Sequence, residues 1–164
     1  MRVRPTTLAD LVGCALLAAG PVMLARGRAG RAQLRAELES QHIAFPAREQ
    51  DLPEPLRHLA GRPVRSGDDA RAFSELIKSH LAAATSGRTY AQITEECAKD
   101  GRGDEKLAAL RQTAFMGETL RAGLMSAYQA SNITLLVMGL GVLTTGVGAS
   151  LLALSHADGR SRDR

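Results

Sequence analysis

The stretch ITLLVMGLGVLTTGVGASLLAL, residues 133–154, carries no charged side chain. Its length and composition are those of a helix that crosses a bilayer, whose hydrocarbon core is about 30 Å thick. The absence of Asp, Glu, Lys and Arg extends on both sides, from Ala122 to Ala157. We therefore predict a transmembrane helix over residues 132–155. It is the strongest single indication of fold in the chain.

Small residues recur within this helix at four-residue spacing. Such a face lets a second helix approach closely, and we expect the first membrane helix to be its partner. The alternative is that glycine is simply common in membrane helices. The residues predicted to pack are Gly139, Gly141, Thr145, Gly146, Ala149 and Ser150.

A second apolar run, LVGCALLAAG at residues 11–20, follows a basic N-terminus. Leu11–Cys14 has the letters of a lipoprotein cleavage box, but the apolar run comes after the cysteine rather than before it. A cleaved secretory signal remains an alternative, although no clean small-x-small site ends the run. Residues 11–25 would span about 22 Å, and residues 6–10 complete the crossing at the interface. We favour a retained transmembrane helix over residues 6–25, with Gly13, Ala18 and Gly20 on its packing face.

The composition fits close-packed helices. Apolar residues make up 45% of the 164-residue chain, yet only 3% are aromatic and there is no tryptophan. A soluble core normally draws on large aromatic side chains for much of its buried area. The net charge of +4 comes from arginines that flank the apolar segments, where anionic lipid head groups attract them. No basic patch interleaved with stacking aromatics indicates nucleic-acid binding.

A long amphipathic helix precedes the second apolar segment. Apolar or small residues recur at spacings of three and four, namely at Leu107, Leu110, Ala114, Gly117, Leu120 or Arg121, Leu124 and Tyr128. Asp104 and Glu105 suit its first turn. Because no proline occurs from Asp104 to Leu154, we expect one helix to run through both segments.

The region between the apolar segments is predicted as a small, mostly helical module. The first helix should continue beyond the membrane and stop near His42, and an irregular, proline-rich connection should follow. A helix should then begin with Asp68 or Asp69 as its N-cap and end at Gly87. Its predicted apolar stripe comprises Ala72, Phe73, Leu76, Ile77, His80 and Leu81. Thr89–Gln92 matches a capping box before a short helix to about Lys99.

These features predict an all-α membrane protein. Two transmembrane helices form a helical hairpin around an extracytoplasmic module, residues 26–131, with cytoplasmic tails at residues 1–5 and 156–164. The positive-inside count is ambiguous, because four arginines after the first helix compete with those in the tails. The arginines of the C-terminal tail and the length of the middle region favour cytoplasmic termini.

Three segments together resemble a known family: LAGRPV at 59–64, ARAFSELIKSHLAAATSGRTYAQI at 70–93, and LRQTAFMGETLRAGLMSAYQASNITLLVMGLGVL at 110–143. The family comprises small two-span membrane proteins of high-GC Gram-positive bacteria, often labelled aromatic ring-opening dioxygenases. The resemblance covers about residues 38–154. It implies two spans around an extracytoplasmic module, and it implies no established catalytic residues or biochemical role.

The dioxygenase label finds no support in the residues. A non-haem iron site needs two histidines and a carboxylate, often with a His-x-Asp/Glu arrangement. His42, His58 and His80 are each followed two positions later by alanine. His156 and Asp158 match by letters but lie in the tail. We therefore predict no catalytic, cofactor-binding or metal-binding residues.

Other reactive side chains have ordinary interpretations. Cys14 and Cys97 lie in such different surroundings that we expect no disulfide. Asp10 could belong to a proton path but more readily fits a helix end near the head groups. The leading expectation is a non-catalytic accessory subunit that packs on a larger membrane complex or on itself, with the lipid bilayer as surroundings. The alternative is a membrane-anchored extracytoplasmic sensor or ligand-binding module.

Overall fold

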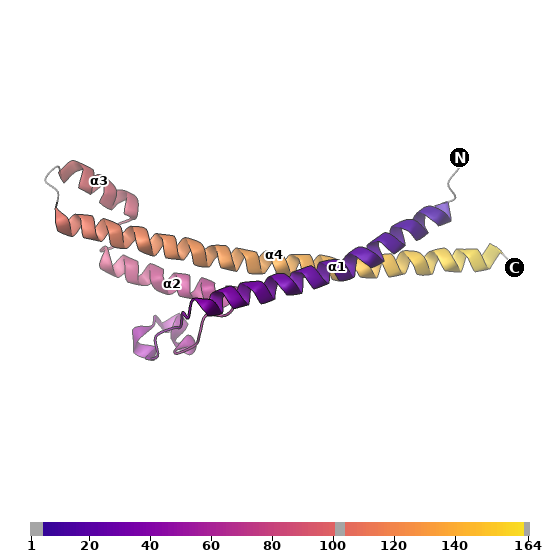
Figure 1. Ribbon diagram of the computed structural model, residues 1–164, viewed down its shortest axis with the longest axis horizontal. Helices are drawn as coiled ribbons and strands as arrows, with labels where there is room; N and C mark the ends of the chain where they lie inside the picture. Colours follow the sequence, from indigo (N-terminus) through magenta and orange to yellow (C-terminus); the bar gives the residue numbers. More distant parts are fainter. Residues whose placement is uncertain (1–4, 101–103, 163–164) are drawn as a thin grey trace. The chain divides into compact units, whose positions relative to one another are not determined.

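The computed structural model describes residues 5–100 and 104–162, and every regular element in this part of the chain is helical. Within these described residues the elements follow in the order α1 (Pro5–Ser40), the 3₁₀ turns η1 (Glu49–Asp51) and η2 (Glu54–Leu59), α2 (Gly67–Ala84), α3 (Tyr90–Asp100) and α4 (Glu105–Arg162) (Figure 1). Two of them, α1 and α4, are long and apolar enough to cross a membrane. The predicted helical class and its two long apolar helices are thereby confirmed.

The chain divides into two compact units. One, here called the helix-pair unit, consists of Met1–Gln33 and Asn132–Arg164, and the other, the central unit, is Leu34–Ser131. Both α1 and α4 contribute to both units. The predicted unbroken helix through the second apolar segment is confirmed, since α4 runs without interruption (Figure 1).

Helix α1 continues through a proline. Pro21 lies inside it and deprives the carbonyl of Leu17 of its helical donor. The helix ends with a backbone turn, in which the N–H of His42 donates to the carbonyl oxygen of Glu39 at 3.1 Å. His42 has a φ of 50°, in the left-handed region that L-residues other than Asn and Asp seldom enter.

The segment between α1 and α2 is packed rather than loose. Its two ends pair through a single antiparallel bridge between Ala44 and Pro63. The N–H of Phe45 donates to the carbonyl of Arg62, and that of Val64 to the carbonyl of Ile43, both at 2.9 Å. Two 3₁₀ turns lie within this segment, where only an irregular connection is predicted. The segment supplies half of the buried core cluster, which comprises Leu38, Phe45, Leu52, Leu59, Val64, Ala70, Leu76 and Leu124.

The N-cap of α2 is Ser66, so the predicted Asp68 and Asp69 caps are wrong. Ser66 has extended backbone angles, and its hydroxyl accepts the N–H of Asp69 at 3.1 Å. The Asp69 carboxylate folds back onto the N–H of Ser66 at 3.1 Å, which completes a capping box. Asp69 is only 4% exposed, and Arg62 pairs with it at 3.1 Å. The prediction fails because an acidic residue near the start of a helix can be either the N-cap or, as Asp69 is here, the third residue of the helix.

Helix α2 packs antiparallel on the central-unit part of α4. Gly67 lies against Ser131 and Tyr128, and Gly117 lies against the Leu81 side chain. The α4 positions predicted to face inward are buried or half-buried, with one exception: Leu120 is 58% exposed, whereas Arg121 is half-buried. His80, predicted on the apolar stripe of α2, is exposed as well. On α4, Arg121 rather than Leu120 takes the inward position, because the hydrocarbon part of its long side chain is apolar.

Helix α3 begins with the predicted capping box. The N–H of Gln92 donates to the Thr89 hydroxyl at 3.3 Å, and the N–H of Thr89 donates to the Gln92 side-chain oxygen at 2.8 Å. Ile93 is fully buried, and Tyr90 contacts Phe115 of α4 with 5.7 Å between ring centroids. The sequence also predicts that Gly101 and Gly103 break the chain before the long helix, and these two residues lie outside the described ranges.

Candidate functional site

The helix-pair unit is organised by glycines at seven-residue intervals on both helices. A Cβ atom placed on Gly13 of α1 would meet the side chain of Leu152 and the carbonyl oxygen of Gly148. One placed on Gly20 would meet Gly141. Position numbers rise along α1 as they fall along α4, so the two helices run antiparallel. The pattern ends with Gly27, which lies against the carbonyl of Thr134 and the side chain of Met138.

These contacts are between backbones. A methyl group on Gly20 would lie 2.6 Å from the carbonyl oxygen of Gly141, and one on Gly148 would lie 2.7 Å from that of Gly13. No real Cβ tolerates such distances, and a backbone cannot move aside as a flexible side chain can. Glycine is therefore required where the helices touch. Close backbone approach of this kind stabilises helix pairs through van der Waals contact.

The hydroxyl next to this contact is already satisfied. Thr145 donates to the carbonyl of Gly141, four residues earlier on the same helix, at 2.8 Å. The contact thus presents no unpaired polar side chain from Thr145. The contact is one of close packing between the two helices.

Of the nine predicted packing residues, the structure brings four to the α1–α4 contact: Gly13, Gly20, Gly141 and Thr145. Gly139 and Gly146 have open space beside them, and Ala18, Ala149 and Ser150 are exposed. Sequence reasoning missed Gly27 and Gly148. The reason is the choice of period: positions four apart drift around a helix, whereas positions seven apart stay on one face over several turns. A search for seven-residue glycine spacing would find the contact.

A groove runs along another face of α4 in the same unit. It has a volume of about 490 Å³ and is lined by Val142, Leu143, Gly146, Val147, Ser150, Leu151 and Leu154. Gly146 forms a low point, because it lacks a side chain and nothing lies within 4 Å of its Cβ position. Leu143 and Leu154 beside it are 65% and 68% exposed. This is where the predicted Gly146 and Ser150 lie.

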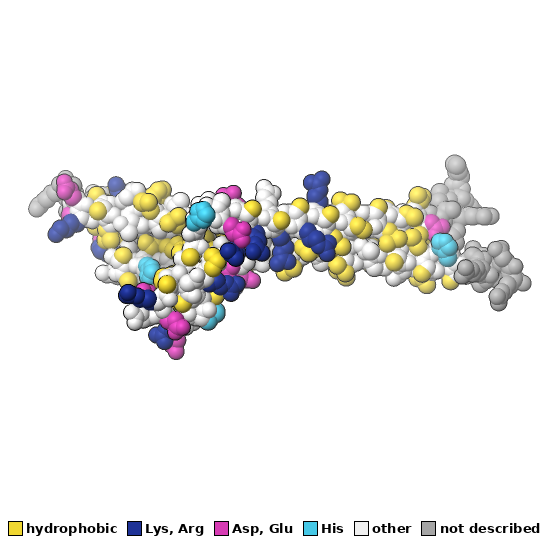
Figure 2. All heavy atoms as spheres, turned by 60° about the horizontal axis from the view of Figure 1, so that its bottom comes forward, with side chains coloured by type: hydrophobic (Ala, Val, Ile, Leu, Met, Phe, Trp, Pro, Cys, Tyr) yellow, Lys and Arg dark blue, Asp and Glu magenta, His cyan; other side chains and the backbone are white. Residues whose placement is uncertain are grey.

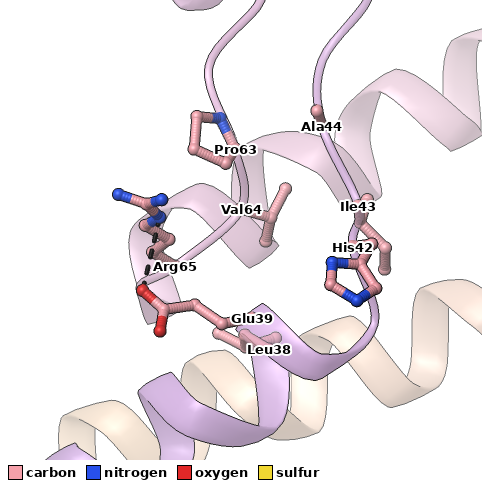
Figure 3. A pocket seen from close by; sticks show the side chains of 8 residues that line it. All are labelled: Leu38, Glu39, His42, Ile43, Ala44, Pro63, Val64 and Arg65. Carbon is pink, nitrogen blue, oxygen red and sulfur yellow. Dashed lines mark ion pairs between the residues drawn. The ribbon is translucent and has the colours of Figure 1, made fainter.

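A second hollow lies in the central unit, where α1 ends (Figure 3). Its volume is about 330 Å³, and its lining residues are Leu38, Glu39, His42, Ile43, Ala44, Pro63, Val64 and Arg65. Leu38 and Val64 belong to the buried core cluster, so the floor is firmly packed. Figure 3 shows His42 on one side of the hollow and the ion pair of Glu39 with Arg65 on the other.

The charged rim of this hollow is internally paired. The Glu39 carboxylate contacts Arg65 Nε at 3.3 Å and Arg35 Nε at 2.9 Å. All three side chains are substantially exposed, so each pair contributes about 1 kcal/mol or less. His42, whose backbone is in the left-handed region, lies on the same rim as this ion pair.

The histidines and cysteines remain dispersed. Among the described residues, no group of three His, Cys, Asp or Glu side chains is placed to hold a metal ion. His156 lies in the last part of α4, and its Nδ1 is 2.7 Å from the carbonyl oxygen of Leu152. Both cysteines are free, and the thiol of Cys97 lies 3.7 Å from the carbonyl of Leu107.

Comparison with known proteins gives no relative. No protein-family model, curated protein or solved structure matches the chain. The resemblance to two-span proteins of Gram-positive bacteria therefore stays a prediction. Function has to be argued from the geometry of the helix-pair unit and of the central unit, each taken by itself.

Three polar atoms are buried and have no hydrogen-bond partner among the described residues: Asp10 Oδ1, Ser74 Oγ and Arg121 Nε. Ser74 lies on α2, seven positions from both Gly67 and Leu81, which both pack on α4. Arg121 lies on α4 between Gly117 and Ser131, the stretch that α2 covers. These two groups therefore lie on the helix faces that form the α2–α4 contact, where a buried polar atom without a partner costs stability. Of the three residues, the sequence singled out Asp10 as a candidate for a proton path and Arg121 as an inward position of the long helix, and it gave no sign of Ser74.

Proposed function

We propose that the protein is a non-catalytic integral membrane accessory subunit that docks on a larger membrane protein complex or on a second copy of itself. Helices α1 and α4 each cross the bilayer once and form a hairpin. The termini are cytoplasmic, and the central unit lies on the extracytoplasmic side. The observation that carries this proposal is the open, shallow surface of α4 around Gly146, here called the groove, which α1 leaves uncovered.

The groove has the properties of a helix-docking surface. Lipid chains are as apolar as an ordinary helix face, so the hydrophobic effect does not drive membrane helices together. Their association depends on close packing instead. Small residues make close packing possible, and here Gly146 and Ser150 line the groove together with Leu143 and Val147, which are 65% and 51% exposed. The Ser150 hydroxyl donates to the Gly146 carbonyl at 2.9 Å, so a docking helix would meet no unsatisfied polar group there.

The test is extraction from native membranes in a mild detergent, followed by size measurement and identification of co-purifying proteins. We expect an assembly larger than one chain. Gly146→Leu fills the groove and should release the chain from its partner. Ala15→Leu places the same leucine side chain at an exposed position on α1 and serves as the matched control. A stable monomer without companions, or equal effects of the two variants, would contradict the proposal.

A second candidate is a sensor or ligand-binding module, which the hollow beside His42 favours. Its volume of about 330 Å³ lies at the small end of the range for ligand sites. Thermal unfolding in the presence of a panel of small metabolites tests this candidate. A rise in the unfolding temperature that Val64→Phe abolishes by filling the floor would support it, and no response across the panel would count against it.

A further inference from the structure

Three arginines on α1 carry charge without a counter-ion. Arg26, Arg28 and Arg31 are exposed, and none of them forms an ion pair with any side chain that the structure describes. The sequence around them explains this, because α1 contains no Asp or Glu between Asp10 and Glu37. The α4 part of the same unit contains no charged residue from Asn132 to Ala157.

Arg35, one turn further along α1, differs from these three. Its Nε donates to Glu39 at 2.9 Å. An arginine next to a carboxylate has its charge compensated locally, whereas Arg26, Arg28 and Arg31 depend on water or on something outside the chain. The chain thus contains both an uncompensated group of arginines and a compensated neighbour for comparison.

The α1–α4 contact fixes the depth of these arginines. Gly27 lies against Thr134 and Met138, which are at the beginning of the apolar stretch of α4. From Gly13 to Gly27, α1 advances about 21 Å alongside that stretch. Arg26 and Arg28 therefore stand where the apolar part of both helices ends. Figure 2 shows hydrophobic side chains along the helices toward the two termini, and basic side chains where that stretch ends.

We propose that Arg26, Arg28 and Arg31 bind the phosphate groups of anionic phospholipids around α1. This inference rests on the proposed membrane-spanning function. At the edge of the hydrocarbon region, the apolar stem of arginine lies along the helix while the guanidinium extends to the phosphate layer. The guanidinium presents paired N–H donors that match phosphate oxygens, and nearby hydrocarbon strengthens the attraction. No acidic side chain in this part of the unit competes for them.

The experiment uses the full chain in bilayer discs made of phosphatidylcholine with one-fifth phosphatidylglycerol. After release into mild detergent, native mass spectrometry counts the lipids that remain bound. We expect phosphatidylglycerol to be enriched over its share of the bilayer. Each uncompensated arginine contributes roughly a fivefold preference, so the Arg26→Gln, Arg28→Gln, Arg31→Gln triple variant should lose most of the enrichment. Screening predicts that high salt weakens the enrichment of the wild-type chain.

Arg35→Gln is the matched control, and it should retain the wild-type enrichment because Glu39 already compensates Arg35. Equal retention by the triple variant, or equal loss in Arg35→Gln, would overturn the proposal. So would displacement of the lipid by millimolar inorganic phosphate, which would indicate a site for soluble anions. Resistance of the chain to alkaline carbonate extraction tests membrane insertion separately, so a failure of the lipid site is distinguishable from a failure of the topology.

Discussion

The backbone contact between α1 and α4 predicts that two glycine-to-alanine substitutions with the same chemistry differ in their effect on the pairing of these helices. Gly20→Ala adds a methyl group 2.6 Å from the carbonyl oxygen of Gly141, where ordinary contact begins at 3.4 Å. The helices must therefore separate by about 1 Å. Gly139→Ala adds the same methyl group where nothing lies within 4 Å.

The expected change in the free energy of separating the two helices has two contributions. Alanine gains up to about 1 kcal/mol over glycine in a helix, and both variants share this gain. Gly20→Ala also bears an overpacking cost of roughly 1–3 kcal/mol, because the clash is with backbone and separation weakens the neighbouring contacts at Gly13 and Gly27. The difference between the two variants, in which the shared gain cancels, should therefore be about 1–3 kcal/mol.

Energy transfer between two dyes provides the assay. The native thiol of Cys14 is exposed on α1, and Leu154→Cys supplies an exposed site on α4. Cys97→Ser removes the remaining thiol and keeps a donor for the carbonyl of Leu107. Sodium dodecyl sulfate added to mild-detergent micelles separates the helices, and the loss of transfer reports the midpoint.

The midpoint of Gly20→Ala should fall below that of Gly139→Ala, which should equal or exceed that of the parent chain. Identical midpoints for the two variants would refute the packing argument, because only the contact distinguishes the two sites. Gly146→Ala, also beside open space, should behave like Gly139→Ala.

Three further predictions concern the central unit, and each is checked by thermal unfolding followed by circular dichroism. Gly117→Val should destabilise the unit by about 1–3 kcal/mol because its side chain would clash with Leu81, whereas Gly123→Val, beside open space, should not clash; equal losses would contradict this contact. His42→Gly should stabilise the chain by up to about 1 kcal/mol, since glycine adopts the φ of 50° without the cost an L-residue bears; a lower unfolding temperature would show that the imidazole contributes more than the backbone strain costs. Asp69→Ala should cost about 2–3 kcal/mol by leaving the N–H groups of Arg65 and Ser66 without their acceptor, and Asp68→Ala, at an exposed neighbour, should cost much less.

The parts of the fold that follow from local rules could be predicted from the sequence. The two apolar helices, the unbroken α4 and the capping box at Thr89 each depend on residues close together in the chain. The connection before α2 could not be predicted, because Phe45, Leu52 and Leu59 are buried only through contact with residues distant in sequence. The sequence placed the cap of α2 at Asp68 or Asp69 and missed Ser66, since all three side chains can accept an N–H.

The candidate site was predicted in part. Glycines in an apolar helix indicated close packing. The four-residue spacing, however, also selected Gly146 and Ser150, which are not in contact with α1. More than one face of α4 carries glycines, and the partner helix determines which face forms the contact. Here the partner carries glycines at seven-residue intervals, and only comparison of both helices reveals the common period. The hollow beside His42 had no sequence indication, because it forms where Ala44 meets Pro63 across the intervening chain.

The glycine contact between α1 and α4 has a consequence for biosynthesis. Gly148 follows Gly13 by 135 positions, and a ribosome adds roughly 5–20 residues per second. In the proposed topology, α1 therefore resides in the bilayer for roughly 7–27 s before its partner is synthesised. Its glycines face lipid during that interval and are open to neighbouring helices. Insertion and pairing must accordingly be separate events, and an overproduced helix with a similar glycine period would compete for α1 only within that interval.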